Sequence, residues 1–162
     1  MSFDFSASLS RRFVLGLAVS GAGLLVCGGR VNATALPQMV VHRDPTCGCC
    51  HKWVEHLVAN GFPVTVNDVP GMRAVKAKLG VPPDLASCHT AEIDGYIVEG
   101  HVPASAIKRL ISDKPQARGL AVPGMPVGSP GMEGGEPETY DVILFNADTR
   151  QTFGRYREDK AV

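Results

Sequence analysis

The sequence lacks a surplus of charge of either sign. Its 162 residues include 16 Lys and Arg against 16 Asp and Glu, so the formal net charge at pH 7 is zero. A protein that binds nucleic acid needs an excess of basic side chains to neutralise phosphates. The charge balance therefore argues against nucleic acid as a partner. The sequence also shows no internal repeat and no coiled-coil pattern, which argues against repeat proteins and helical zippers.

An apolar run long enough to cross a bilayer is also missing. The one candidate, "FVLGLAVSGAGLLV", is rich in Gly and Ala and falls short of the roughly 20 apolar residues that a spanning helix needs. Arg11 and Arg12 precede this run, and "NATAL" with Ala33 and Ala35 follows it. A charged segment, a short apolar segment and an A-x-A site predict a signal peptide over residues 1–35. Once it is cleaved, we expect no association with the membrane.

The predicted signal is compatible with two export routes. "SRRFVL" resembles a twin-arginine signal, which exports bacterial proteins already folded, but an ordinary Sec signal can also hold two arginines. Either route takes the protein out of the cytoplasm. Cys27 lies inside the signal and is expected to be discarded with it. The mature domain, residues 36–162, keeps four cysteines: Cys47, Cys49, Cys50 and Cys88.

The mature chain alternates between strand and helix patterns, which predicts a single α/β domain: a mixed sheet with helices on both faces. The expected elements are a strand at 38–42, a helix from 50 to the stop at 60–61, a strand at 62–69, a helix at 71–80, a hairpin turning at 94–95, a helix opened by Pro103, and a C-terminal β-hairpin of 140–146 and 151–157. Residues 114–138 are rich in Pro and Gly and are expected to form an irregular loop that is functional or disordered. The charged segments "KAK" (76–78) and "REDK" are interpreted as solvated.

Cys47 and Cys50 form a C-x-x-C motif where the first strand meets the first helix, the position typical of thioredoxin-like redox proteins. The helix N-terminus carries a partial positive charge that favours thiolate over thiol. Such thiolates attack disulfides, and they also bind metals. The position therefore indicates reactive sulfur without deciding between the two chemistries.

Cys49 favours a metal site. An adjacent pair of cysteines forms only a strained disulfide, so Cys47–Cys50 is the natural bridge, and a third thiol hinders clean exchange. For metal binding the third thiol is useful, because thiolates can bridge several soft ions. Cu(I) prefers sulfur ligands, so ligand softness favours copper. Zinc is the alternative, held by Cys47, Cys50, Cys88 and His89 in one tetrahedral site.

Cys88 and His89 precede the third strand, which a thioredoxin-like layout places beside the N-terminus of the first helix. Cys88 or its neighbour there occupies the position usually taken by a substrate-guiding proline, which weakens the oxidoreductase interpretation. His89 is the histidine predicted to bind metal, because it is paired with Cys88. Met125 and Met132 offer neutral thioether ligands for Cu(I), although methionines also fill gaps in packing.

The segments "DPTCGCCHKW", "SCHTAEIDGYIVEGHVPA" and "GLAVPGMPVGSPGME" resemble the CopG family of bacterial periplasmic copper-resistance proteins. The resemblance implies a thioredoxin-like fold and a cluster of copper ions bound in the periplasm by the four cysteines, completed by nearby Met and His. It also implies association with copper-export or copper-chaperone proteins and redox cycling of copper. It does not by itself make the protein an enzyme.

Three hypotheses follow from the residues and this resemblance. The first is a periplasmic Cu(I)-binding protein that contributes to copper resistance, with a multinuclear site. The second is a thiol–disulfide oxidoreductase in which Cys47 is the nucleophile and Cys50 resolves. The third is a small binding module with two structural disulfides. It is the least favoured of the three, because three clustered thiols cannot all be paired locally.

Overall fold

The structure is a computed structural model that describes residues 35–162. The predicted signal peptide, apart from Ala35, lies outside the described residues. Within residues 35–162, none of the helices combines the length and the apolarity that crossing a membrane requires. The described residues belong to one compact unit, Thr34–Val162.

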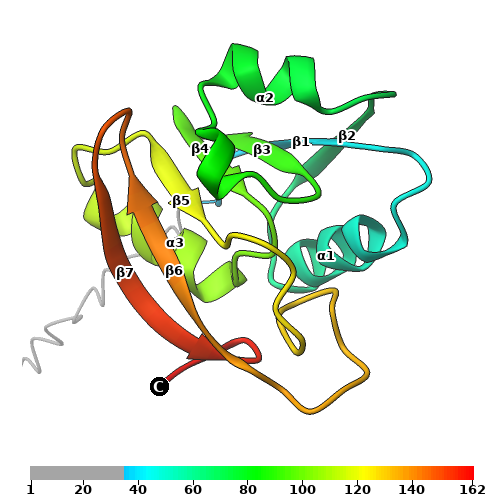
Figure 1. Ribbon diagram of the computed structural model, residues 1–162, viewed down its shortest axis with the longest axis vertical. Coiled ribbons are helices and arrows are strands. Elements are labelled where there is room, and N and C mark those ends of the chain that lie inside the picture. Colours follow the sequence, from blue (N-terminus) through cyan, green and yellow to red (C-terminus); the bar gives the residue numbers. More distant parts are fainter. Residues whose placement is uncertain (1–34) are drawn as a thin grey trace, which may run out of the picture. The chain divides into compact units, whose positions relative to one another are not determined.

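The described chain forms an eight-stranded mixed sheet flanked by helices, which confirms the predicted α/β class (Figure 1). In chain order the elements are β1 (Met39–Arg43), α1 (Gly48–Ala59), β2 (Val64–Asp68), α2 (Arg73–Leu79), the 3-10 turn η1 (Pro83–Leu85), β3 (Thr90–Ile93), β4 (Tyr96–Glu99), α3 (Ala104–Asp113), β5 (Gly119–Ala121), β6 (Thr139–Phe145), β7 (Arg150–Arg157) and β8 (Lys160–Ala161). The strand order is β2-β1-β3-β4-β5-β6-β7-β8. β1 pairs with β2, and β4 with β5, in parallel, and the other pairs are antiparallel.

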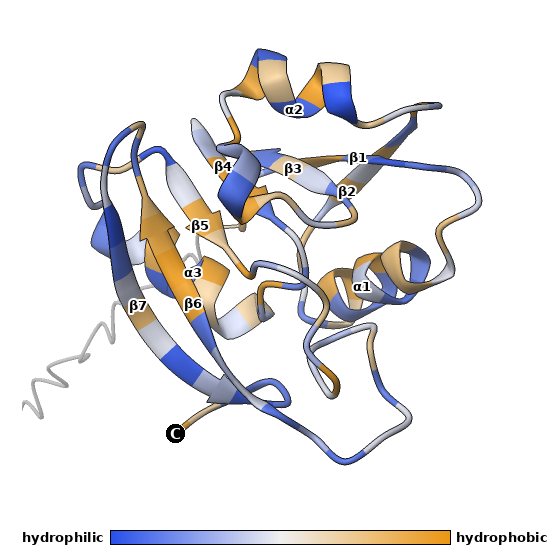
Figure 2. Ribbon diagram, viewed as in Figure 1, coloured by the Kyte–Doolittle hydropathy of each residue, from blue (hydrophilic) through white to orange (hydrophobic). Residues whose placement is uncertain are grey.

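Helices cover both faces of the sheet. Successive residues of a strand point to opposite faces, so neighbouring residues can belong to different hydrophobic cores. Val98 joins the larger core, which contains Trp53 of α1 and Ile107 of α3. Its neighbour Ile97 joins a smaller core with Leu85 of η1. Figure 2 shows mostly hydrophobic colouring along β6, whereas the neighbouring β7 is mostly hydrophilic. The sheet therefore becomes more solvated toward its C-terminal edge.

The predicted hairpin is confirmed: residues 94–95 connect β3 and β4, and both take positive φ values, 48° at Asp94 and 82° at Gly95. Two positive φ values are what a type I′ turn requires, and they match the twist of the flanking strands. Pro103 lies one residue before α3 as its N-cap, not at the first helical position as expected. The C-terminal hairpin of β6 and β7 also forms as predicted.

The expectation that residues 114–138 lack regular structure was wrong at β5. This three-residue strand joins the two halves of the sheet by pairing with β4 and β6. A side chain at Gly119 would lie 1.8 Å from the Ile97 carbonyl oxygen, so the close approach of the strands needs glycine. A strand this short, opened by glycine, carries too little alternation to be detected from sequence. β8 was missed because a strand of two residues shows no alternation that a sequence pattern could reveal.

Candidate metal centre

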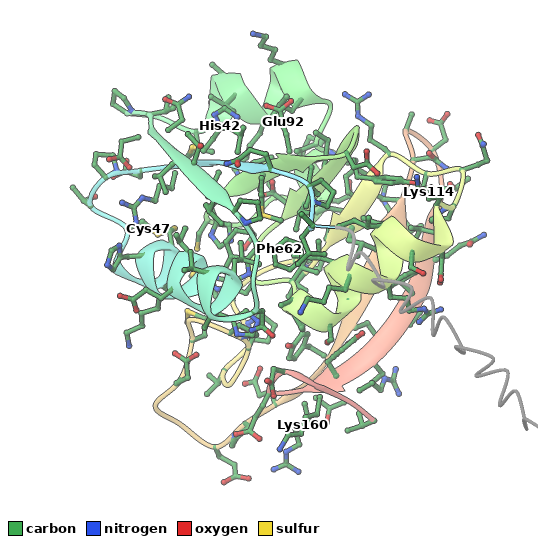
Figure 3. All side chains as sticks on the ribbon, turned by 180° about the vertical axis from the view of Figure 1, so that it is seen from behind. His42, Cys47, Phe62, Glu92, Lys114 and Lys160 are labelled. Atoms are coloured by element: carbon green, nitrogen blue, oxygen red, sulfur yellow. A yellow bond between two sulfur atoms is a disulfide. The ribbon has the colours of Figure 1, made fainter. Side chains whose placement is uncertain are left out.

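The loop between β1 and α1 sets the first cysteines at a helix N-terminus (Figure 3). The Asp44 carboxylate accepts hydrogen bonds from the backbone N–H and the hydroxyl of Thr46, which tightens the turn and lowers the pKa of Asp44. Cys47 follows as the N-cap of α1, with an extended backbone and no side-chain capping bond. Cys47 therefore lies at the end of the helix that carries unpaired N–H groups and a partial positive charge.

Four sulfur atoms gather at this end of the helix. Cys47 and Cys50 form a disulfide, the bridge expected from sequence, while Cys49 and Cys88 are free. The Cys49 sulfur lies 3.5 Å from that of Cys47 and 3.8 Å from that of Cys88. All four sulfurs lie within 4.8 Å of one another. The fold thus brings Cys88 to the other three sulfurs, although 38 residues separate it from Cys50 in sequence.

A buried ion pair anchors the segment that carries Cys88. The Glu99 side chain is fully buried and accepts hydrogen bonds from Lys76 Nζ at 2.5 Å, the Thr90 hydroxyl at 2.6 Å and the Ser87 backbone N–H at 2.6 Å. The Lys76 side chain is only 12% exposed. The interpretation of "KAK" as solvated charge was therefore wrong for Lys76, because no sequence pattern reveals the buried carboxylate that it pairs with.

The Cys88 thiol does not resemble an activated nucleophile. Burial, and next the neighbouring Cys49, raise the pKa of Cys88 to about 11, although the positive charge of Lys76 opposes them. A reactive thiol is expected to have a lowered pKa. Cys88 is therefore better suited to give up its proton to an incoming metal ion than to attack a disulfide unaided.

This pKa predicts slow alkylation of Cys88. In apo protein with the disulfide intact, the rate at Cys88 should rise about tenfold per pH unit from pH 7 and still be rising at pH 10, since only the thiolate reacts. Mass spectrometry of peptides after timed iodoacetamide treatment measures this rate. Cys49→Ser should shift the midpoint to lower pH, because it removes the second cause of the raised pKa. A rate that levels off below pH 8 would contradict the prediction.

His89 lies next to this centre but outside the four-sulfur set. Its side chain is fully buried, it stacks on Trp53 with ring centroids 4.2 Å apart, and neither of its ring nitrogens has a hydrogen-bond partner. Trp53 is itself held by a hydrogen bond from its indole N–H to the Val102 carbonyl oxygen at 2.9 Å. Burial, and next the neighbouring His101, hold the pKa of His89 well below 6.5, so the ring is neutral at pH 7.

His101 is a second buried imidazole that the sequence analysis did not select. It lies edge-on to His89, with ring centroids 4.9 Å apart. Its Nδ1 lies 2.8 Å from the Pro130 carbonyl oxygen, while its Nε2 has no partner. Burial lowers the pKa of His101 too. No spacing or pairing in "EGHVP" indicates that His101 is buried and hydrogen-bonded. Its hydrogen-bond partner, the Pro130 carbonyl oxygen, comes from a loop 29 residues later.

The Pro/Gly loop packs against α1. A side chain at Gly131 would lie 2.7 Å from the Cys49 carbonyl oxygen and 3.3 Å from His101 Nδ1, and Gly131 has a φ of +91°, so this contact requires glycine. The loop's two methionines differ in exposure. Met132 is half-buried beside Gly131, whereas Met125 is 53% exposed. Near Met125, the Gly124 carbonyl accepts a hydrogen bond from the Ser87 hydroxyl at 2.5 Å, which ties the loop to the segment of Cys88.

Comparison with known proteins gives three findings. Residues 85–132 match a family described as "Protein of unknown function, DUF411". Two similar solved structures are described as "Copper resistance protein copG- Form 1" and "Copper resistance protein copG- Form 2". Their identities to this chain are 48% and 49%, and each alignment covers 75% of this chain and 98% of the other, with a TM-score of 0.70. None of the curated proteins matched the chain.

Proposed function

Since this chain belongs to the CopG family of copper resistance proteins, we propose that it binds Cu(I) through a thiolate site and contributes to copper resistance. The proposed ligands are Cys47, Cys49, Cys50 and Cys88. The observation that carries the proposal is the gathering of these four sulfurs within 4.8 Å of one another, with no His, Asp or Glu of residues 35–162 in the set. An all-sulfur set suits Cu(I), and bridging thiolates would hold more than one ion.

The disulfide makes metal binding depend on redox state. Two electrons and two protons from a dithiol or phosphine reductant convert the Cys47–Cys50 bridge into two thiols. Cu(I) then displaces the protons from the thiols that it binds. In the oxidised form only Cys49 and Cys88 remain as free thiols among residues 35–162. Reduction would thus double the number of available thiolates.

The test is the copper content of reduced and oxidised protein under anaerobic conditions. Protein reduced with a phosphine is expected to bind several Cu(I) ions per chain, and protein with the disulfide intact should bind Cu(I) at least about tenfold more weakly. Elemental analysis after competition with a Cu(I) chelator gives both values. Reduced and fully alkylated protein is the control. Stoichiometric zinc instead of copper, or no affinity for Cu(I), would remove the proposal.

The proposed function also includes a fold type, a cellular location and additional ligands. We propose a thioredoxin-like arrangement, supported by a C-x-x-C motif that begins at the N-cap of α1, in the loop that follows β1. A signal peptide over residues 1–35 would direct the domain of residues 36–162 to the periplasm, where copper-export or copper-chaperone proteins would exchange copper with it. Met125, Met132 and His89 are proposed to complete the centre. Redox cycling of copper is a further proposed activity.

One observation favours thiol–disulfide exchange as a second candidate function. The Cys47–Cys50 disulfide joins a partly exposed N-cap cysteine to a fully buried one. An accessible attacking thiol at a helix N-terminus with a buried resolving thiol is the arrangement that exchange needs. This candidate requires neither Cys49 nor Cys88, which separates it from the copper proposal.

A further inference from the structure

The segment that carries Cys88 is held from both sides by one buried carboxylate. Glu99 is the last residue of β4, and its side chain is fully buried. One of its oxygens accepts the Ser87 backbone N–H and the other accepts the Thr90 hydroxyl, each at 2.6 Å. Thr90 and Glu99 are also partners in the pairing of β3 with β4. The carboxylate thus fixes the chain immediately before Cys88 and two residues after it.

The residue that follows Glu99 contacts the same segment. Gly100 donates its backbone N–H to the His89 carbonyl oxygen at 3.0 Å. It has a φ of +73°, and a side chain at this position would lie 2.8 Å from Cβ of Ser87, so the close approach requires glycine. The end of β4 therefore contacts the chain on both sides of Cys88 and leaves that residue little freedom to move.

The buried ion pair is not needed for stability alone. Glu99 is the only fully buried carboxylate among residues 35–162, and Lys76 Nζ donates to it at 2.5 Å and to the Thr90 hydroxyl oxygen at 3.0 Å. An apolar pair of similar volume often replaces a buried ion pair at no cost in stability. An apolar pair cannot accept the Ser87 N–H, however, so the distinctive contribution of Glu99 is its hydrogen bonds to the segment of Cys88.

From these contacts we propose that Glu99 is a positioning residue of the candidate metal centre, holding the Cys88 sulfur in reach of the other three sulfurs. The inference rests on the proposed function. Cys88 is the one sulfur that α1 does not place, and its sulfur lies 3.8 Å from that of Cys49. A ligand that is held in place before the ion arrives binds without a further cost of ordering. Residues that orient metal ligands typically contribute about 10–100-fold to affinity.

Two double variants separate hydrogen bonding from packing. Lys76→Met with Glu99→Leu fills the space but offers the Ser87 N–H no acceptor. Lys76→Met with Glu99→Gln removes the same charges, but the amide oxygen still accepts that N–H and the amide N–H donates to the Thr90 hydroxyl. In phosphine-reduced protein the leucine variant should bind Cu(I) at least about tenfold more weakly than the glutamine variant, as measured by competition with a Cu(I) chelator. Equal affinities would overturn the inference.

The same comparison in a Cys88→Ser background gives a result that a general loss of stability would not produce. If Glu99 acts through Cys88, the difference between the leucine and glutamine variants should fall below about twofold, because the residue being positioned is gone. A difference of the same size in both backgrounds overturns the inference. If the leucine variant does not fold, Thr90→Val against Thr90→Ser makes the same comparison, since only serine keeps the hydroxyl that Glu99 accepts.

A second readout needs no copper. In oxidised apo protein carrying Cys27→Ser, Cys49 and Cys88 are the free thiols. Phenylarsine oxide bridges two neighbouring thiols: two As–S bonds form, and its oxygen leaves as water with the two thiol protons. The leucine variant should form this adduct at least about tenfold more slowly than the glutamine variant, because a small misplacement of reacting groups costs up to about 100-fold in rate.

Mass spectrometry of timed samples measures the rate of adduct formation. Equal rates in the two variants would overturn the positioning role of Glu99, whatever the copper content of the wild type. Unequal rates in a protein whose wild type binds no Cu(I) would instead remove the proposed function and leave the positioning of Cys88 by Glu99 in place. The two failures are therefore distinguishable.

Discussion

Replacing Cys88 by serine is expected to weaken Cu(I) binding by more than about tenfold while the Cys47–Cys50 disulfide still forms. Cys88 is the one sulfur of the set that comes from outside the start of α1, and its sulfur lies 3.8 Å from that of Cys49. Without it, the remaining thiolates lie on one side of the ion. Loss of a ligand should cost more than loss of a supporting residue, which costs about 10–100-fold. Competition with a Cu(I) chelator measures the change.

Cys49→Ser is the companion variant, because Cys49 lies between the disulfide and Cys88, 3.5 Å from the Cys47 sulfur. It should lower the number of Cu(I) ions bound per chain, since it removes a bridging thiolate. Reduction of insulin disulfides by the same two variants separates the candidate functions. Exchange by Cys47 and Cys50 would survive both changes. Full copper binding by Cys88→Ser, with loss of insulin reduction only in Cys47→Ser, would favour the oxidoreductase.

Lys76→Met is expected to destabilise the oxidised apo protein by about 3–5 kcal/mol, the usual cost of removing one partner from a buried ion pair. The change leaves the Glu99 carboxylate buried without its cation, although the hydroxyl of Thr90 and the N–H of Ser87 still contact it. Methionine keeps the length of the apolar stem, so the loss reports on charge more than on packing. Urea unfolding followed by circular dichroism measures the free energy of unfolding.

Two controls make this result specific. Lys78, two residues along α2, is exposed, and Lys78→Met should change the free energy of unfolding by less than about 0.5 kcal/mol. Lys76→Met combined with Glu99→Leu should recover much of the loss, because an apolar pair can replace a buried ion pair at little cost. A change below about 1 kcal/mol in Lys76→Met would show that Glu99 does not depend on Lys76.

Local patterns were sufficient to predict most elements of the fold. The hairpin at 94–95 followed from Asp-Gly between alternating runs, and α1 followed from its apolar spacing and its stop at 60–61. Val58 shares the apolar spacing of Trp53, Val54 and Leu57, which predicts a buried position, but it is 56% exposed. β5 was missed because its place depends on glycine allowing a close approach to β4.

The sequence by itself determined that reactive sulfur lies at the start of the first helix, because a strand, three crowded cysteines and a helix are all local features. Only the tertiary structure decided that Cys88 joins them, that Lys76 is buried against Glu99, and that His101 receives its orientation from Pro130. Each of these contacts joins residues at least 23 positions apart, and such pairs are set by how the sheet and its loops pack. Hydrophobic periodicity describes one element at a time, so it cannot report which distant polar groups that packing brings into contact.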